Sequence, residues 1–226
     1  MGSEMCIRDR NTDVNYTRAK VMNSKYTYDP RYTDGVERTL AAATDQYPRL
    51  STFRFDLRFP TDGTGRRDER VISRFFDSLK YHANAQMTAR RNAGLTCKNL
   101  TSIRYIWCRE YGLVEDNRHY HVMLLVNKDT FYTLGDYRPQ CNNGIDSLAN
   151  VIQKAWCSAL KLPWEAYAGQ VHFPEQPCGW IERKRPEHED QYAAVRQRAM
   201  YLAKEYTKHY GCLLYTSPSP RDGLLS

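Results

Sequence analysis

The sequence lacks several features that would assign the protein to a special class. Its 7 cysteines include no CxxC pair, which excludes a zinc ribbon and argues against a disulfide-stapled fold. No apolar run approaches the roughly 20 residues that a membrane-spanning helix needs. A signal peptide, an internal repeat and a low-complexity tract are all missing. We therefore expect a protein of a reducing cytoplasm, with no membrane partner.

The two ends of the sequence are related to each other at the level of DNA. One DNA segment can encode residues 212–222 on one strand and, in another frame, residues 2–9 on the complementary strand. This relation is typical of a sequencing adapter, so we expect residues 1–10 and 212–226 to be adapter artefacts without a role in the fold. We divide the gene fragment between them into a polar N-terminal extension, residues 11–47, and one domain, residues 48–211.

The remaining chain is basic and rich in tyrosine. The whole net charge of +7 belongs to it, because the two ends together hold three basic and three acidic residues. Neutralisation of phosphates by lysine and arginine drives non-specific affinity for nucleic acids. The charge is therefore consistent with a polyanionic partner, and equally with a protein whose surface is simply basic.

Hydrophobic periodicity predicts alternating strands and helices. Strict alternation in STFRFDLRF predicts a half-buried strand at 51–59, with Arg54, Asp56 and Arg58 on its charged face. The other predicted strands are residues 100–110, 118–127 and 167–175, and the predicted helices are residues 35–46, 68–91, 145–161 and one beginning near 189. Strands separated by helices predict an α+β fold, with a mainly antiparallel central sheet and helices packed on it.

Two histidines stand one residue apart in the predicted strand RHYHVMLLVNK. His119 and His121 point to the same face, because successive side chains of a strand alternate. Two neutral imidazoles side by side offer two ligand positions for a divalent metal. The alternative is one histidine in a local hydrogen bond and one at the surface.

A third ligand for such a metal should be a carboxylate, because a metal that engages phosphate prefers oxygen. Glu110 ends the preceding predicted strand, and a hairpin would bring it back beside His119. Glu115 and Asp116, in the predicted turn, are alternative ligands.

A tyrosine lies about 80 residues further along the chain, in YLAKEYTK. On a helix, Tyr201 and Lys204 share one face, and Lys208 lies one turn further on. A tyrosine beside a phosphate-polarising metal can attack phosphorus and form a covalent phosphotyrosyl link. Taken alone, the same spacing is ordinary for an amphipathic helix.

Taken together and in this order, the three segments resemble the HUH endonucleases of rolling-circle replication. They are most similar to the replication-protein family encoded by gene II of filamentous phages (inoviruses). STFRFDLRFP resembles the first motif, WCREYGLVEDNRHYHVMLLVNKDTFYTLG the metal-binding motif, and YLAKEYTK the nucleophile motif. The resemblance covers about residues 48–210, and its most distinctive part is the segment from the histidines to NKDTFYTLG.

The resemblance implies an RRM-like or ferredoxin-like HUH catalytic core. His119, His121 and Glu110 would hold Mg²⁺ or Mn²⁺, Tyr201 would be the nucleophile, and Lys204 would position the phosphate. The enzyme would nick an origin in single-stranded DNA and remain attached as a 5′-phosphotyrosyl intermediate. The free 3′-hydroxyl would then prime a polymerase of the bacterial host, with a host helicase as a further partner, whether the gene belongs to a phage or to an integrated prophage.

Some relatives use two tyrosines four residues apart. Here Tyr206 follows Tyr201 by five positions, which turns it away on a helix, so we expect a single nucleophile. Arg54, Arg58 and Lys208 are candidates for contacts with the DNA backbone.

Other interpretations use the same residues. A transposase or relaxase-like strand transferase would share the site, whereas a metal phosphohydrolase would not need Tyr201. A non-catalytic RRM-like module would bind nucleic acid with structural histidines. Tyr105, Trp107 and Tyr120 could stack on bases or pack in the core. The histidines without partner spacing are expected to be surface or core residues: His82, His172, His188 and His209.

Overall fold

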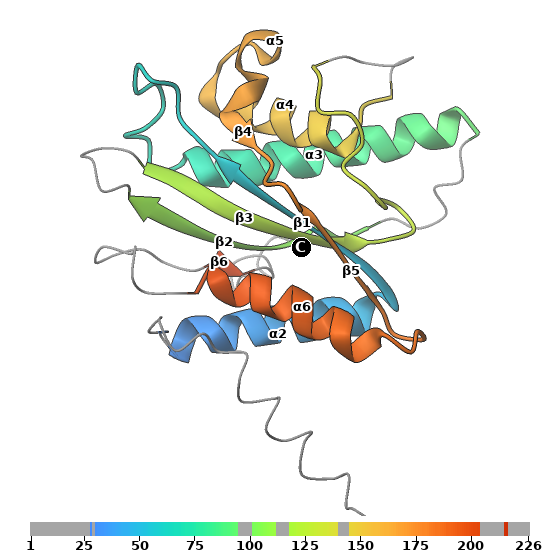
Figure 1. Ribbon diagram of the computed structural model, residues 1–226. Helices are drawn as coiled ribbons and strands as arrows, with labels where there is room; N and C mark the ends of the chain where they lie inside the picture. Colours follow the sequence, from blue (N-terminus) through green and yellow to red (C-terminus); the bar gives the residue numbers. More distant parts are fainter. Residues whose placement is uncertain are drawn as a thin grey trace, which may run out of the picture.

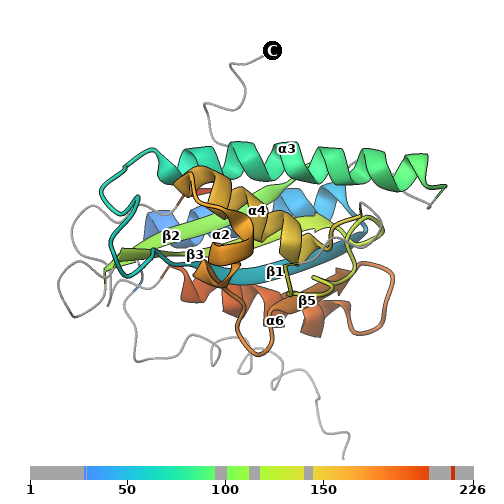
Figure 2. The same cartoon turned by 90° about the horizontal axis from the view of Figure 1, so that it is seen from above.

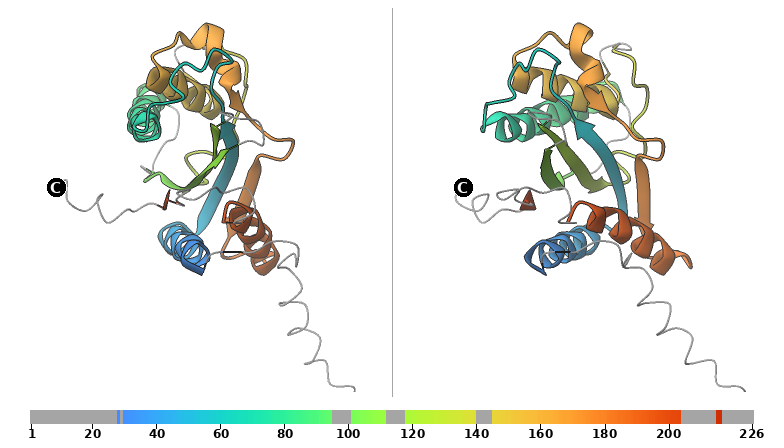
Figure 3. Two further views of the ribbon diagram at one scale, coloured as in Figure 1. Left: turned by 90° about the vertical axis from the view of Figure 1, so that its left-hand side faces the viewer. Right: turned by 60° about the vertical axis from the view of Figure 1, so that its left-hand side comes forward.

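The computed structural model describes residue 28 and residues 30–94, 101–111, 118–139, 145–203 and 215–216. Within these residues, one antiparallel sheet lies between two layers of helices (Figures 1 and 3). The strand order is β4-β1-β3-β2-β6, and β5 pairs with β1 beside β4. The predicted α+β fold with a mainly antiparallel sheet is confirmed.

The elements follow one another as a β-α-β-β-α-β series with additions at both ends. The strands are β1 (Arg49–Leu57), β2 (Arg104–Tyr111), β3 (Arg118–Asn127), β4 (Val171–His172), β5 (Cys178–Glu182) and β6 (Tyr215–Thr216). The helices are α2 (Pro30–Gln46), α3 (Val71–Asn92), α4 (Leu148–Leu160), α5 (Trp164–Tyr167), the short 3₁₀ helix η1 (Ala168–Gln170) and α6 (His188–Tyr201). The series β1-α3-β2-β3-α4-β4 has the element order of the ferredoxin-like motif.

The two faces of the sheet are covered by different helices. Side chains at alternate positions of β1, β2 and β3 pack with α3 and α4 in a first core, which is rich in aromatic rings. Figure 2 shows α3 and α4 side by side over the sheet. The intervening side chains face α2 and α6 and form a second, smaller core.

Strand β1 differs from its prediction. A half-buried strand was expected, but Thr52 and Asp56 on its second face are also buried. The reason is that β1 is central: it pairs with β3 on one side and with β4 and β5 on the other, and α6 lies over its second face. Strand β4 lies within the predicted strand 167–175 but has only two residues, and β5 was not predicted.

The first core fixes the end of β1 at which the chain leaves the sheet. Ser147 caps α4 by accepting a hydrogen bond from the Asn150 backbone N–H, and Trp156 on that helix donates its indole N–H to the Arg58 carbonyl at 2.8 Å. Gly65 has φ +73°, and a Cβ there would lie 2.5 Å from Leu160 Cδ2. The loop after β1 is thus packed closely on α4.

Three aromatic side chains considered for base stacking belong to this core. Trp107 and Tyr120 are buried, and Tyr105 stacks on Phe76 with ring centroids 3.7 Å apart. These three rings therefore pack in the core, which was one of the two roles considered for them. Cys157 is buried and free, and burial raises the pKa of its thiol to about 11.

Both terminal segments contribute elements to the sheet or its cover. Helix α2, which begins at Pro30 within the predicted extension, packs in the second core through Val36, Leu40 and Ala43. Tyr215–Thr216, in the predicted adapter sequence, pair with Trp107 and Ile106 of β2. Among the described residues, the helices are too short or too polar to cross a membrane.

Candidate metal centre

The predicted ligands meet at one end of the sheet. Glu110 lies near the end of β2 and pairs in register with His119 at the start of β3, and His121 follows on the same face. This face is the one covered by α2 and α6. Hairpin register alone therefore produces the group that the sequence predicted. The predicted turn, with Glu115 and Asp116, lies outside the described residues.

The three side chains form one compact group whose ligand atoms all lie within 4.8 Å of one another. His121 Nε2 lies 2.8 Å from Glu110 Oε2 and 3.2 Å from His119 Nε2, and His119 Nε2 lies 3.5 Å from Glu110 Oε2. Two ligands at right angles, each about 2.1 Å from a metal, are about 3.0 Å apart. The spacing of the three atoms fits this value, so the group could hold a metal ion.

Asp56 of β1 orients one of these ligands. Its Oδ1 lies 2.5 Å from His121 Nδ1, and the two residues are paired across β1 and β3. With the Nδ1–H donated to Asp56, the lone pair of His121 Nε2 points toward Glu110 and His119. Metal-binding histidines are commonly held by a carboxylate in this way.

The imidazole of His121 therefore lies between two carboxylates. Burial disfavours its charged form, but the hydrogen bonds and charges of Asp56 and Glu110 outweigh burial and raise its pKa. Burial alone would raise the pKa of Asp56, but the hydrogen bond and charge of His121 outweigh burial and lower the pKa of that carboxyl. Both shifts show that this space favours positive charge, which a proton or a metal ion can supply.

The network extends to a histidine that the sequence gave no reason to select. His172 of β4 places its Nδ1 3.4 Å from Asp56 Oδ2, because β4 pairs with β1 at that position. His172 had been expected to be an isolated surface or core residue. A strand was predicted at 167–175, but the proximity of His172 to Asp56 depends on the pairing of β4 with β1, which the sequence does not specify.

The predicted nucleophile lies on the same face of the sheet as the metal ligands. Tyr201 is the last residue of α6, its side chain is 38% exposed, and the Arg54 guanidinium lies 4.8 Å from its ring centroid. Arg54 precedes Asp56 by two residues on β1, a step of roughly 7 Å. Tyr201 thus packs on the side chain that stands one row along β1 from the Asp56–His121 pair.

The other predicted residues are placed as follows. Arg58 follows the end of β1 and is exposed near the ligand end of the sheet. The helix that carries Tyr201 ends at that residue, and Lys204, Tyr206 and Lys208 lie outside the described residues. Arg54 packs on Tyr201, and its buried Nε has no hydrogen-bond partner among the described residues.

A glutamate outside the predicted set links the end of β2 to the start of β3. Glu69 accepts one hydrogen bond from Arg109 of β2 at 2.6 Å and one from Arg118 of β3 at 2.7 Å. Arg118 also donates to the Asp68 carbonyl, and its side chain is buried. The loop after β1 is thereby tied to both strands that carry the ligands, close to where the ligands begin.

The chain matches the family model described as the YagK/YfjJ C-terminal domain over residues 11–214. It is 32% identical over 189 residues to the uncharacterized protein YagK of Escherichia coli K12, covering 80% of this chain and 87% of YagK. It is 30% identical over 191 residues to the uncharacterized protein YfjJ of the same organism, covering 80% of this chain and 88% of YfjJ. No solved structure matches significantly.

Proposed function

Because the chain belongs to the YagK/YfjJ C-terminal domain family, whose two E. coli relatives are named as uncharacterized, we propose a function from the geometry of the site. The protein is a metal-dependent endonuclease that nicks single-stranded DNA through Tyr201 and so initiates rolling-circle replication. One observation carries this proposal: the Glu110–His119–His121 group lies on the sheet face that α6 covers, and Tyr201 of α6 packs there on Arg54, two residues along β1 from the Asp56 that contacts His121.

The ligand group suits a divalent ion that binds phosphate. His119, His121 and Glu110 would hold Mg²⁺ or Mn²⁺, which would polarise the scissile phosphodiester. Asp56 keeps the His121 ring in the orientation that presents Nε2 to the group. Two histidines and one carboxylate are also a donor set for Fe²⁺, so metal identity needs a direct measurement.

Tyr201 would carry out the covalent step. Its phenolic oxygen forms a bond to phosphorus, the bond from phosphorus to the 3′ oxygen breaks, and that oxygen leaves as a hydroxyl after taking up a proton from solvent. The phenolic proton is released to solvent. Arg54 holds the ring in place and supplies a positive charge beside it, which would attract the phosphate.

The expected context follows from the resemblance to the inovirus gene II family. Arg58, Lys204 and Lys208 would add phosphate contacts around the cut. The free 3′-hydroxyl would prime a host polymerase, with a host helicase unwinding the duplex, in the cytoplasm of a bacterium. The order of the elements, the histidine pair and the tyrosine support this proposal. The net charge of +7 would favour binding of DNA.

Capture of DNA on a denaturing gel tests the proposal. The protein is incubated with Mg²⁺ or Mn²⁺ and circular single-stranded or supercoiled phage-type DNA, and the products are denatured before electrophoresis. We expect a nick and a covalent adduct with the wild type, and no adduct with Tyr201→Phe, which keeps the ring on Arg54 but lacks the hydroxyl. A full yield of adduct from that variant would exclude Tyr201 as the nucleophile.

The substrate separates replication from the related strand-transfer activities. A replication initiator should cut a phage-type origin, whereas a transposase or relaxase-like enzyme should prefer hairpin ends or a transfer origin. Nicking without any adduct, and unaffected by Tyr201→Phe, would instead indicate a metal phosphohydrolase.

A further inference from the structure

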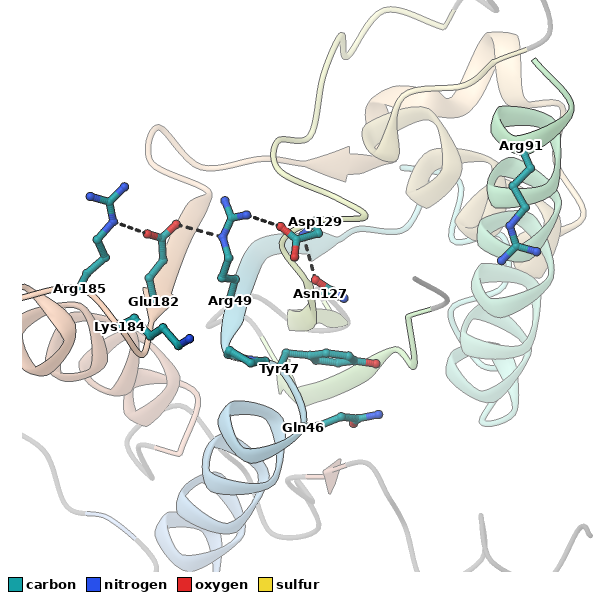
Figure 4. Close-up of a pocket in the computed structure, with 10 residues that line it drawn as sticks. Gln46, Tyr47, Arg49, Arg91, Asn127, Asp129, Glu182, Lys184 and Arg185 are labelled. Carbon is teal, nitrogen blue, oxygen red and sulfur yellow. Dashed lines mark hydrogen bonds and ion pairs between the residues drawn. The ribbon is translucent and has the colours of Figure 1, made fainter. Parts of the chain in front are cut away.

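A second polar region lies at the opposite end of β1 and β3, away from the metal centre. An open groove of about 1170 Å³ is formed there beside the ends of α2 and α3 and the turn before α6 (Figure 4). Its charged lining residues are Arg49, Arg91, Lys184 and Arg185, with Asp129 and Glu182. Cations outnumber carboxylates in this lining, which we call the basic groove.

An exposed pair of stacked aromatic rings borders the basic groove. Tyr132 and Trp180 are 56% and 36% exposed, their ring centroids are 5.5 Å apart, and their planes differ by 14°. The Lys128 ammonium lies 5.0 Å and 5.3 Å from the two centroids. We call these three residues the aromatic platform. The Trp180 indole N–H donates to the Tyr132 carbonyl, which fixes the two rings together.

The platform and the groove form one continuous surface. Lys128 of the platform pairs with Glu182 of the groove at 2.5 Å, and Glu182 also accepts a hydrogen bond from Arg185 at 3.0 Å. Trp180 and Glu182 are alternate residues of β5 and therefore point to the same face of the sheet. A chain-like ligand whose unit stacks on the rings would thus place its next one or two units beside the guanidinium groups of the groove.

We infer that the aromatic platform and the basic groove together form a second binding surface for single-stranded DNA, separate from the metal centre. Aromatic rings that stack on bases, next to cations that meet phosphates, are the combination by which proteins bind unpaired strands. Bases within a duplex are already stacked on one another, so the platform selects single strands. The inference rests on the proposed function only in taking DNA as the partner.

The surface is remote enough to bind a segment of DNA that is not being cut. Trp180 pairs in register with Ser51, and Asp56 lies five residues further along β1, which is roughly 17 Å. This distance corresponds to about five nucleotides at the duplex rise of roughly 3.4 Å, and to fewer in a more extended single strand. The platform therefore contributes affinity for a flanking strand and takes no part in the covalent step.

Fluorescence anisotropy with a labelled oligo-dT of about 15 nucleotides tests the inference. We expect the double substitution Tyr132→Ala and Trp180→Ala to weaken single-strand binding by about tenfold or more, and to leave binding of a duplex of the same length little changed. Tyr81→Ala is the matched control, because Tyr81 is 71% exposed on α3 and lies outside both regions. Unchanged single-strand affinity in a folded double variant overturns the inference, as does an equal loss for single strand and duplex.

A second measurement does not depend on the double variant folding. Oligo-dT should quench tryptophan fluorescence of the wild type, and Trp180→Phe should remove most of that quenching, because Trp107 and Trp156 are buried and Trp164 lies on α5, covered by Lys154 and outside the groove lining. Quenching that survives Trp180→Phe overturns the inference. Lys184→Glu, at an exposed lining position, should weaken single-strand binding and reduce its salt dependence; unaltered binding would count against the groove.

Failure of this inference and failure of the proposed nicking activity give different results. The double variant should still form the Tyr201 adduct at saturating DNA concentration, because both rings are remote from the ligands. If the wild type binds single strands through the platform but forms no adduct, the nicking proposal fails and the platform stands. If the adduct forms but the platform variants bind normally, the nicking proposal stands alone.

Discussion

Two clusters of charged side chains lie at opposite ends of β1 and β3, and they differ in what neutralises their carboxylates. At one end, the described ion-pair partners of Asp56 and Glu110 are imidazoles of His119, His121 and His172. At the other end, the partners of Asp129 and Glu182 are permanent cations: Arg49, Lys128 and Arg185. Each end thus has two carboxylates, which are paired with titratable imidazoles at one end and with permanent cations at the other.

This difference indicates which cluster needs an added ion. An imidazole, unlike a guanidinium or an ammonium group, can exchange its proton for a metal ion, so a divalent cation can supply the positive charge of the first cluster. The second cluster is already balanced by its own side chains and has no need of one. Dependence on divalent metal should therefore be a property of one end of the sheet only.

Removal of a ligand should have the largest effect. We expect His121→Ala to lower metal affinity by at least about 100-fold and to abolish metal-dependent nicking, since a ligand is lost outright. Glu182→Gln is the matched control at the other end and should leave metal affinity unchanged. Calorimetric titration with Mn²⁺ and a plasmid-nicking assay measure the two effects; normal nicking by His121→Ala would remove it from the ligand set.

Weakening the support of a ligand should have a smaller effect. Asp56→Asn keeps the shape of the side chain but removes the charge that holds the His121 N–H, and we expect a loss of about 10- to 100-fold in metal affinity. The same titration measures it. If Asp56→Asn binds Mn²⁺ as tightly as the wild type, Asp56 does not position His121 for metal.

Added metal should stabilise the fold through the first cluster. At ten times its dissociation constant, an ion that binds only the folded state adds about 1.4 kcal/mol to the free energy of unfolding. Urea titration with and without Mn²⁺ should show this gain in the wild type and not in His119→Ala. An equal gain in both proteins would place the ion elsewhere.

The second cluster should affect stability only through pH, and weakly. Hydrogen bonds from Lys128 and Arg185 lower the pKa of Glu182 from 4.5 to about 2. Because the folded-state pKa is depressed, the stabilisation is present above about pH 4.5 and is lost as the pH falls toward 2. As the pH falls from about 4.5 toward 2, the melting temperatures of the wild type and Glu182→Gln should therefore converge. Thermal melts at several pH values measure this. A difference in melting temperature that does not change with pH would show that Glu182 is not involved.

The sequence predicted the ligand group because that group depends on local structure. Strand β3 has the predicted bounds 118–127, and a hairpin with β2 necessarily brings Glu110 opposite His119. Hydrophobic alternation also identified the two faces of β1, and hydrophobic periodicity identified the helix that forms α3. Together they predicted the α+β fold.

The parts that escaped prediction depend on pairings between distant segments. Asp56 was recognised as a charged residue of the first strand, but its contact with His121 requires the register between β1 and β3. His172 and Trp180 are placed by β4 and β5, which are too short to show a period. The contact of Tyr201 with Arg54 depends on how α6 packs on the sheet, which no local pattern specifies.

The short distance along the chain between the ligands has a consequence for the order in which the protein matures. Glu110 and His121 are separated by 11 residues, whereas Asp56 and His121 are separated by 65. Closing the shorter loop costs about 1.6 kcal/mol less chain entropy. The hairpin that carries Glu110 and His121 can therefore assemble early in folding, while Asp56 and Tyr201 reach it later. If the proposed function is correct, a nascent chain would bind its metal ion before the phenol of Tyr201 is in place.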